Sequence, residues 1–215
     1  MVPQELRDVR PVTLQRFRPS TCAAYLVGVP TSIDVHPAAA EAARLLDVDS
    51  DRWQHVVGVG ERAESLAHTL PGGVRELLVS AAWLHDIGYA PALHDTGLHS
   101  LDGARYLRSI GASQRLCRLV AHHTASIVEA EFRGLHEVLE AEFPIEHSDV
   151  ADALTYVDMT TGPKGQPLTV RERLAEILER YPRDHVVHQS IRRASPSIIA
   201  TVTRVERRLQ SSQPR

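Results

Sequence analysis

Residues 81–89 read AAWLHDIGY and close the most apolar stretch of the chain, which runs from Val74 to Ile87. Apolar side chains point in almost every direction of a helical projection of this stretch, as is typical of a helix buried in the middle of a bundle. We expect this helix to end at Gly88. An ionised Asp86 there is costly unless a cation or strong donors meet its carboxylate. The His85-Asp86 pair therefore indicates a polar site at the end of a buried helix, although a solvated helix cap gives the same dipeptide.

Helical periodicity continues on both sides of this stretch, and no alternating strand pattern or repeat is present. Local signals mark several helix starts, among them the capping box Thr169-x-x-Glu172. The fold class is therefore all-α, a bundle of helices joined by short links. The expected helices cover residues 37–46, 50–70, 74–87, 101–110, 113–123, 127–143, 148–160, 169–180, 184–194 and 196–209.

Residues 1–48 contain Pro11, Pro19, Pro30 and Pro37 between short apolar stretches, so we expect an irregular N-terminal extension with a helix only at 37–46. The remainder, residues 49–210, is expected to form one domain, because a chain of 215 residues suits a single core.

The composition is 43% hydrophobic and 24% charged, which is ordinary for a globular protein and argues against disorder. A net charge of −3 gives no general attraction for nucleic acid or anionic membranes. No apolar run is long enough to span a membrane and no secretory segment is evident, so we expect a cytoplasmic protein. The two cysteines predict neither a disulfide nor a sulfur metal site, whereas the 12 histidines are unusual.

Two further residues could join His85 and Asp86. Asp158 lies on the apolar side of its predicted helix, in line with Leu154, so a carboxylate is aimed at the core. Buried carboxylates are usually paired with an arginine or bound to metal, and both readings stay open here. His55 falls at the edge of an apolar stripe, where its ring could reach a cleft beside the core or could be a hydrogen-bonded structural histidine.

The order of these residues resembles the H…HD…D signature of the HD superfamily over roughly residues 50–180. The resemblance implies a helical bundle with a divalent metal held by His55, His85, Asp86 and Asp158. It also implies hydrolysis of a nucleotide or related phosphate ester by a metal-activated hydroxide, for which Asp86 would be catalytic.

Several HD branches add two histidines that build a second metal site with the aspartate of the HD pair as bridge. We choose His99 and His123 for these positions, with His94 as an alternative to His99. His123 lies in line with apolar residues of its predicted helix, whereas His122 lies in line with two arginines. Two divalent transition metal ions are therefore expected, and Fe, Mn, Co, Ni and Zn all suit histidine and carboxylate ligands.

A partial resemblance to the bacterial diadenosine-tetraphosphatase branch points to a basic residue after the final aspartate. Lys164 and Arg171 are candidates for contact with a small phosphorylated substrate, and so is Arg62, two turns after His55. Each also fits a plain exposed loop or a surface ion pair. Two other functions stay open: a mixed-valence di-iron oxygenase that cleaves a C–C or C–P bond with the same six ligand types, and a non-catalytic nucleotide-binding HD module. The sequence gives no indication of the oligomeric state.

Overall fold

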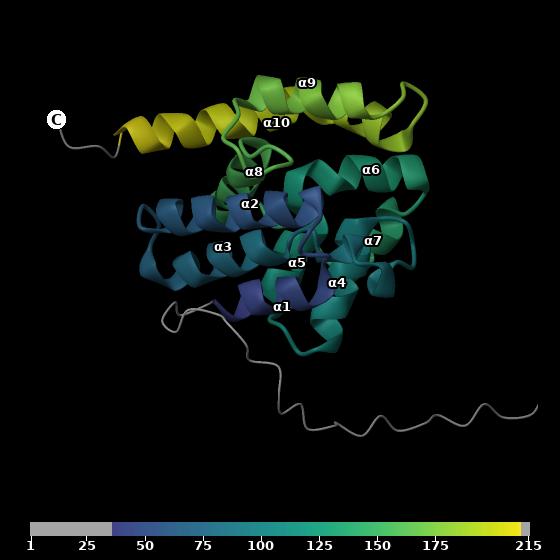
Figure 1. Cartoon of the computed structure of the whole chain (residues 1–215), viewed down its shortest axis with the longest axis horizontal. Helices are drawn as coiled ribbons and strands as arrows, with labels where there is room; N and C mark the ends of the chain where they lie inside the picture. The colour runs from purple at the N-terminus through teal and green to yellow at the C-terminus, as the bar shows by residue number, and fades with distance from the viewer. Residues whose placement is uncertain (1–35, 212–215) are drawn as a thin grey trace, which may run out of the picture. The chain divides into compact units, whose positions relative to one another are not determined.

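In the computed structural model, residues 36–211 are described, and they fold almost entirely into helices (Figure 1). Within this range the only β-structure is a single antiparallel bridge between Thr161 and Pro167. The all-α prediction is confirmed. The elements in chain order are α1 (Pro37–Leu45), α2 (Asp51–Ala67), α3 (Gly72–Leu84), the 3₁₀ turns η1 (Ile87–Tyr89) and η2 (Pro91–Leu93), α4 (His99–Ser109), α5 (Gln114–His122), the 3₁₀ turn η3 (His123–Ala125), α6 (Ser126–Arg133), α7 (His136–Glu142), α8 (Asp149–Met159), α9 (Val170–Arg180) and α10 (Val186–Ser211).

Helix α3 lies at the centre of the bundle and contacts α1, α2, α5 and α8, as its apolar sequence predicts. Leu78, Ala81 and Ala82 are completely buried, and such burial is the main stabilising contribution in a core of this kind. The helix ends at Leu84 rather than near the predicted Ile87, because Asp86 leaves the helical conformation with φ −105° and ψ 8°. The His85-Asp86 pair therefore lies in the turn between α3 and η1.

The single helix predicted over residues 127–143 is two helices, α6 and α7. Gly134 separates them and has a φ of +68°, in the left-handed region that favours glycine. Its N–H closes the last turn of α6 by bonding to the carbonyls of Ala130 and Glu131. This left-handed C-terminal residue is a common way to end a helix, so the prediction of one continuous helix was wrong.

The two helices predicted over 184–194 and 196–209 are one helix, α10, with Pro196 in its interior. Proline lacks an N–H and usually breaks or kinks a helix. Here the buried residues Ala194 and Ile198 continue one apolar face across the proline, and that face packs on α8 and α9. Burial of a continuous face keeps the two segments together. In Figure 1, α9 and α10 lie side by side along one edge of the bundle.

Helix α1 is part of this bundle, although the sequence analysis assigned residues 37–46 to the extension. Ala38, Ala39 and Ala42 are buried against α3 and neighbouring core residues. Residues 1–35, the rest of the predicted extension, lie outside the described residues, so the boundary at residue 48 stays a prediction.

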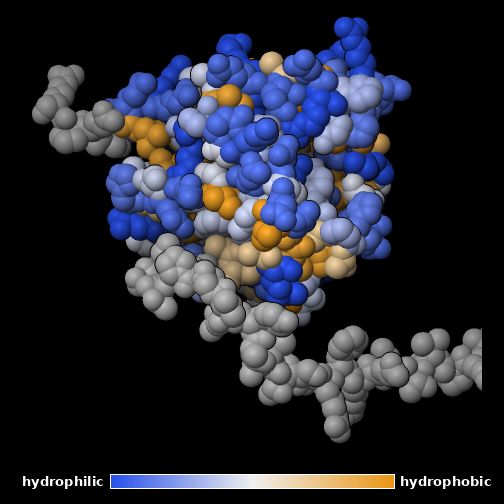
Figure 2. All heavy atoms as spheres, in the orientation of Figure 1, coloured by the Kyte–Doolittle hydropathy of each residue, from blue (hydrophilic) through white to orange (hydrophobic). Residues whose placement is uncertain are grey.

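The face of the bundle drawn in Figure 2 is mostly hydrophilic, with hydrophobic residues concentrated near α1 and α4. The apolar faces of the helices have thus mostly turned inward, as the helical periodicity requires. None of the described helices has both the length and the apolar character needed to cross a membrane.

Candidate metal centre

Six predicted ligands converge at one place inside the bundle, and we call them the six-residue cluster. His99 is partly buried and the other five are buried. The cluster divides into two groups, and the ligand atoms of each group lie within 4.8 Å of one another. One group consists of His55, His85 and Asp158, and the other of Asp86, His99 and His123. His55 belongs to α2, His99 to α4 and Asp158 to α8.

Backbone carbonyls fix the orientation of three rings in the six-residue cluster. Nδ1 of His55, His85 and His123 lies 3.1, 2.7 and 2.7 Å from a carbonyl oxygen. Because a carbonyl oxygen only accepts hydrogen bonds, the proton of each neutral ring must be on Nδ1. The unprotonated Nε2 atoms then point into the cluster. Metal-binding histidines commonly have this outer hydrogen bond, which sets both the tautomer and the ring direction.

The inward-facing Nε2 atoms of His55, His85 and His123 lack the proton that a hydrogen-bond donor needs. Nε2 of His55 lies 3.0 Å from Oδ1 of Asp158, and Nε2 of His99 lies 3.2 Å from Nε2 of His123. Nε2 of His85 is buried and has no hydrogen-bond partner among the described residues. The lone pairs of His55 Nε2 and Asp158 Oδ1 face each other at 3.0 Å, so they require a shared proton or a cation. The donor set of imidazole nitrogens and carboxylate oxygens therefore fits divalent transition metals.

Asp86 lies between the two groups, and its two carboxylate oxygens face different histidines. Oδ2 lies 3.4 Å from Nε2 of His85 and 3.9 Å from Nε2 of His55. Oδ1 lies 3.4 Å from Nε2 of His99 and 3.6 Å from Nε2 of His123. This arrangement places one carboxylate within reach of both groups.

Both aspartates of the six-residue cluster are ionised. Burial would raise the pKa of Asp86, but the Arg52 guanidinium and the neighbouring His85 and His123 together outweigh it and hold the pKa of that carboxyl well below its usual range. Burial likewise opposes ionisation of Asp158, but the adjacent His55 and His85 rings outweigh it and hold the pKa of that carboxyl below its usual range. Ionised carboxylates are the form that binds metal.

The histidines differ in how they respond to this buried charge. Burial lowers the pKa of His55 and His99, although the neighbouring carboxylates oppose it. Burial also disfavours the charged form of His85, but Asp86 outweighs it and raises the pKa of His85. A proton on His85 and a cation are thus alternative ways to neutralise the same carboxylates, and metal binding displaces the proton.

A family model described as HD domain matches residues 52–184, which is more than half of the chain. The chain belongs to the HD family. The matched range includes every member of the six-residue cluster, and proteins of this family are mostly metal-dependent phosphohydrolases. No curated protein and no solved structure matches the chain.

The HD domain stores backbone strain next to the six-residue cluster. Thr124 and Ala125, directly after His123, have φ of 47° and 58°, in the left-handed region. Each costs about 1–3 kcal/mol for residues other than glycine, and a β-branched threonine is rare there. The Thr124 hydroxyl donates a hydrogen bond to Oδ2 of Asp158. The strained turn therefore presents Thr124 to Asp158 while it leaves His123 inside the cluster.

The cavity of the HD domain that contains Asp86 and Asp158 has a volume of about 80 Å³. Arg52 is the main wall residue that the sequence analysis missed: its Nη1 donates to Oδ2 of Asp86, and its guanidinium lies 4.0 Å from the centroid of the Tyr89 ring. Arg52 precedes His55 by one helical turn, and this spacing is a signal that could have identified it. Other wall residues that the sequence analysis did not name include Tyr89, Thr124, Glu129, Arg173, Arg180 and Tyr181.

None of the three basic residues predicted to contact substrate lines this cavity. Arg62 lies over the Tyr156 ring, donates to its hydroxyl at 3.2 Å, and lines a separate open cavity of about 440 Å³. The side chains of Lys164 and Arg171 are exposed. His94, the alternative to His99, is exposed as well and lies outside the six-residue cluster.

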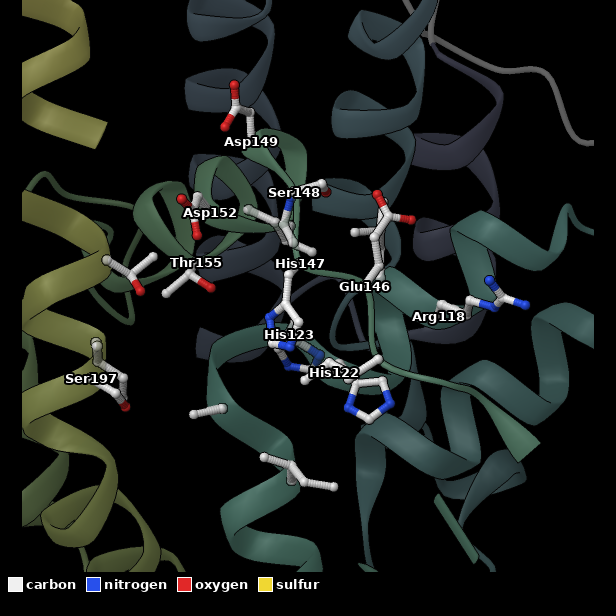
Figure 3. Close-up of a pocket in the computed structure, with 18 of the residues that line it drawn as sticks. Arg118, His122, His123, Glu146, His147, Ser148, Asp149, Asp152, Thr155 and Ser197 are labelled. Atoms are coloured by element: carbon white, nitrogen blue, oxygen red, sulfur yellow. Dashed lines mark hydrogen bonds between the residues drawn. The ribbon is translucent and has the colours of Figure 1, made fainter. Parts of the chain in front are cut away.

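His122 and His123 have different surroundings, although they are neighbours in the sequence. Both line a larger cavity of about 460 Å³, which Figure 3 shows in close-up. His122 Nε2 donates to the carbonyl of Phe143 at 2.5 Å, whereas Nε2 of His123 faces His99 and Asp86. The structure thus brings His123, and not His122, into the six-residue cluster. The role of these residues as metal ligands stays a prediction.

Gly88→Ala is expected to lower the free energy of unfolding by about 3 kcal/mol and to displace His99. A Cβ at residue 88 would lie 1.8 Å from the carbonyl oxygen of His99, so the start of α4 has to move. Gly73→Ala is the matched control, because a Cβ there meets nothing within 4 Å. Urea unfolding of both variants measures the difference, and equal stability of the two would contradict the tight contact at Gly88.

Proposed function

We propose that this chain is a metal-dependent hydrolase of a phosphoric ester or anhydride, acting on a nucleotide or a related metabolite. The main support for this proposal is the position of Asp86 between the two groups of the six-residue cluster. Its two carboxylate oxygens lie 3.4–3.9 Å from the Nε2 atoms of four histidines that come from both groups of the six-residue cluster. A carboxylate in that position suits a pair of cations, as in two-metal hydrolases.

Two divalent transition metal ions fit the donor set, which suits Fe, Mn, Co, Ni or Zn. His55, His85 and Asp158 would hold one ion, and His99 and His123 would hold the second, with Asp86 within reach of both. When bound, such ions make water nucleophilic at neutral pH and withdraw negative charge from a phosphate group.

The chain itself supplies position and protection from bulk water. Backbone carbonyls hold the rings of His55, His85 and His123, so their Nε2 atoms need no rearrangement to act as ligands. Arg52 donates to one oxygen of Asp86, and Thr124 donates to one oxygen of Asp158. Each carboxylate is thereby held in one orientation. Burial of the cluster limits its contact with bulk water, and the 80 Å³ cavity gives access to Asp86 and Asp158.

Metal analysis combined with a phosphatase screen tests this function. We expect the anaerobically purified protein to contain about two transition metal ions per chain and to hydrolyse a phosphate ester without consuming oxygen. A chelator should remove the activity and the same metal should restore it. Substrate loss that depends on O₂ would instead support the di-iron oxygenase. Metal-loaded protein that binds a nucleotide but hydrolyses none of the tested esters would support the non-catalytic module.

The family match does not extend to a particular branch of the HD family. The resemblance to diadenosine tetraphosphatases therefore stays a prediction, as does location in the cytoplasm. A screen that contains both dinucleoside polyphosphates and small phosphate esters tests the branch directly.

A further inference from the structure

We propose that Arg173 receives an oxyanion of the substrate and that this substrate is a small organophosphate rather than a nucleotide. The inference rests on the proposed hydrolase function and narrows its substrate class. It is carried by the incomplete hydrogen bonding of a buried arginine and by the size of the cavity that this arginine lines.

Arg173 is a buried cation with unused donors. It is 4% exposed, in the first turn of α9, and lines the cavity that contains Asp86 and Asp158. Its Nη1 donates to Glu176 at 2.5 Å, but its buried Nε has no partner among the described residues. A guanidinium has five N–H donors and is suited to bidentate binding of carboxylate or phosphate oxygens. Leaving these donors unmet in a buried position is costly, so a ligand anion is the natural partner.

The surrounding charges leave Arg173 as the arginine available to a ligand in this cavity. Arg52 already donates to Asp86. Arg180 is exposed, and its Nε and Nη2 both donate to Oε1 of Glu176. The single carboxylate of Glu176 therefore serves both Arg173 and Arg180.

The cavity restricts the size of what can be attached to the oxyanion. Its volume of about 80 Å³ is well below the roughly 300–1,000 Å³ of pockets that hold drug-sized ligands such as a nucleoside. Ile177 of α9 and Val187, Ile191 and Ala194 of α10 form an apolar part of its wall. Helices α9 and α10 pack on each other and thus hold this wall in place. A phosphate with a few attached carbon atoms fits this space, whereas a base with its ribose would have to extend beyond it.

The test measures binding of inorganic phosphate to the metal-loaded full chain by isothermal titration calorimetry. Arg173→Met keeps the length of the side chain, and Glu176 retains Arg180 as its partner, so the variant should fold. We expect Arg173→Met to weaken phosphate binding about ten- to hundredfold while metal content and melting temperature are kept. Arg171→Met is the matched control, because Arg171 is exposed on the same helix, and it should bind phosphate as the wild type does.

Competition completes the test. Glycerol phosphate should displace inorganic phosphate at least tenfold more effectively than AMP does. Equal phosphate binding by Arg173→Met and wild type, or no phosphate binding by wild type, overturns the role of Arg173, and stronger displacement by AMP overturns the size limit. If Arg173→Met does not fold, Arg173→Lys decides, because it keeps the charge but loses the planar fork and should still bind more weakly. Failure of the proposed function has a different signature, namely metal-loaded wild type that hydrolyses no phosphate ester whatever its affinity for phosphate.

Discussion

Asp86→Ala is expected to lower phosphate ester hydrolysis by about a thousandfold, the loss typical of removing a group that organises charge at the reacting centre. Among the described residues, Asp86 is the carboxylate whose two oxygens face both groups of the six-residue cluster. Alanine removes the ligand shared by the two proposed ions, so metal content should fall together with activity. Elemental analysis and steady-state kinetics of the same preparations measure both quantities.

The fold should tolerate this change. Asp86→Ala leaves Arg52 without its carboxylate, but the Arg52 side chain is 24% exposed and lies over the Tyr89 ring, so its guanidinium can turn toward water. The loss of stability should therefore stay within about 2 kcal/mol, in the ordinary range for single substitutions. Asp95→Ala is the matched control, because the Asp95 carboxylate is 77% exposed and Arg105 is its one ion-pair partner among the described residues. An Asp86→Ala variant as active as Asp95→Ala would remove the metal-hydrolase account.

Helical periodicity placed Asp158 and His123 on apolar helix faces and His85 and Asp86 at the end of a buried helix, but only the resemblance to the HD superfamily joined the six residues into one predicted site. The turn after a fully apolar helix places His85 and Asp86 at the core, and a 3.6-residue period separates His123 from His122. Periodicity could not decide between His99 and His94, because the direction of a side chain in a loop does not follow from its position in the sequence. His99 was chosen with the help of the family resemblance.

Features that depend on packing between distant helices could not be predicted in this way. The rotation of α9 that buries Arg173 and exposes Arg171 is set by its contacts with α10 and not by either residue alone. Pro196 follows a reliable local rule for a helix start, but burial of a continuous apolar face overrides it. Arg62 is on the same helix as His55, yet its guanidinium lies over Tyr156, outside the cavity of the cluster.

The second metal site can be tested on two neighbouring histidines. His123→Ala is expected to lower the metal content from about two ions to about one per chain, because its inward Nε2 lies 3.6 Å from Asp86 and 3.2 Å from His99. His122→Ala should leave the metal content near two, because His122 Nε2 is bonded to the Phe143 carbonyl and does not face the cluster. Each variant changes a single histidine, so comparing their metal contents tests which of the two rings faces the cluster.

Anaerobic loading with excess metal, removal of unbound ions and elemental analysis give the stoichiometry of both variants. His122→Ala loses a hydrogen bond and should be destabilised by about 1 kcal/mol, so thermal unfolding has to accompany the metal analysis. Loss of one ion from His122→Ala but not from His123→Ala would show that the register of this segment is off by one residue. If the wild-type chain never binds more than one metal ion, His99 and His123 are structural residues and not metal ligands. Hydrolysis would then depend on a single ion held by His55, His85 and Asp158, with Asp86 as a further ligand of that ion.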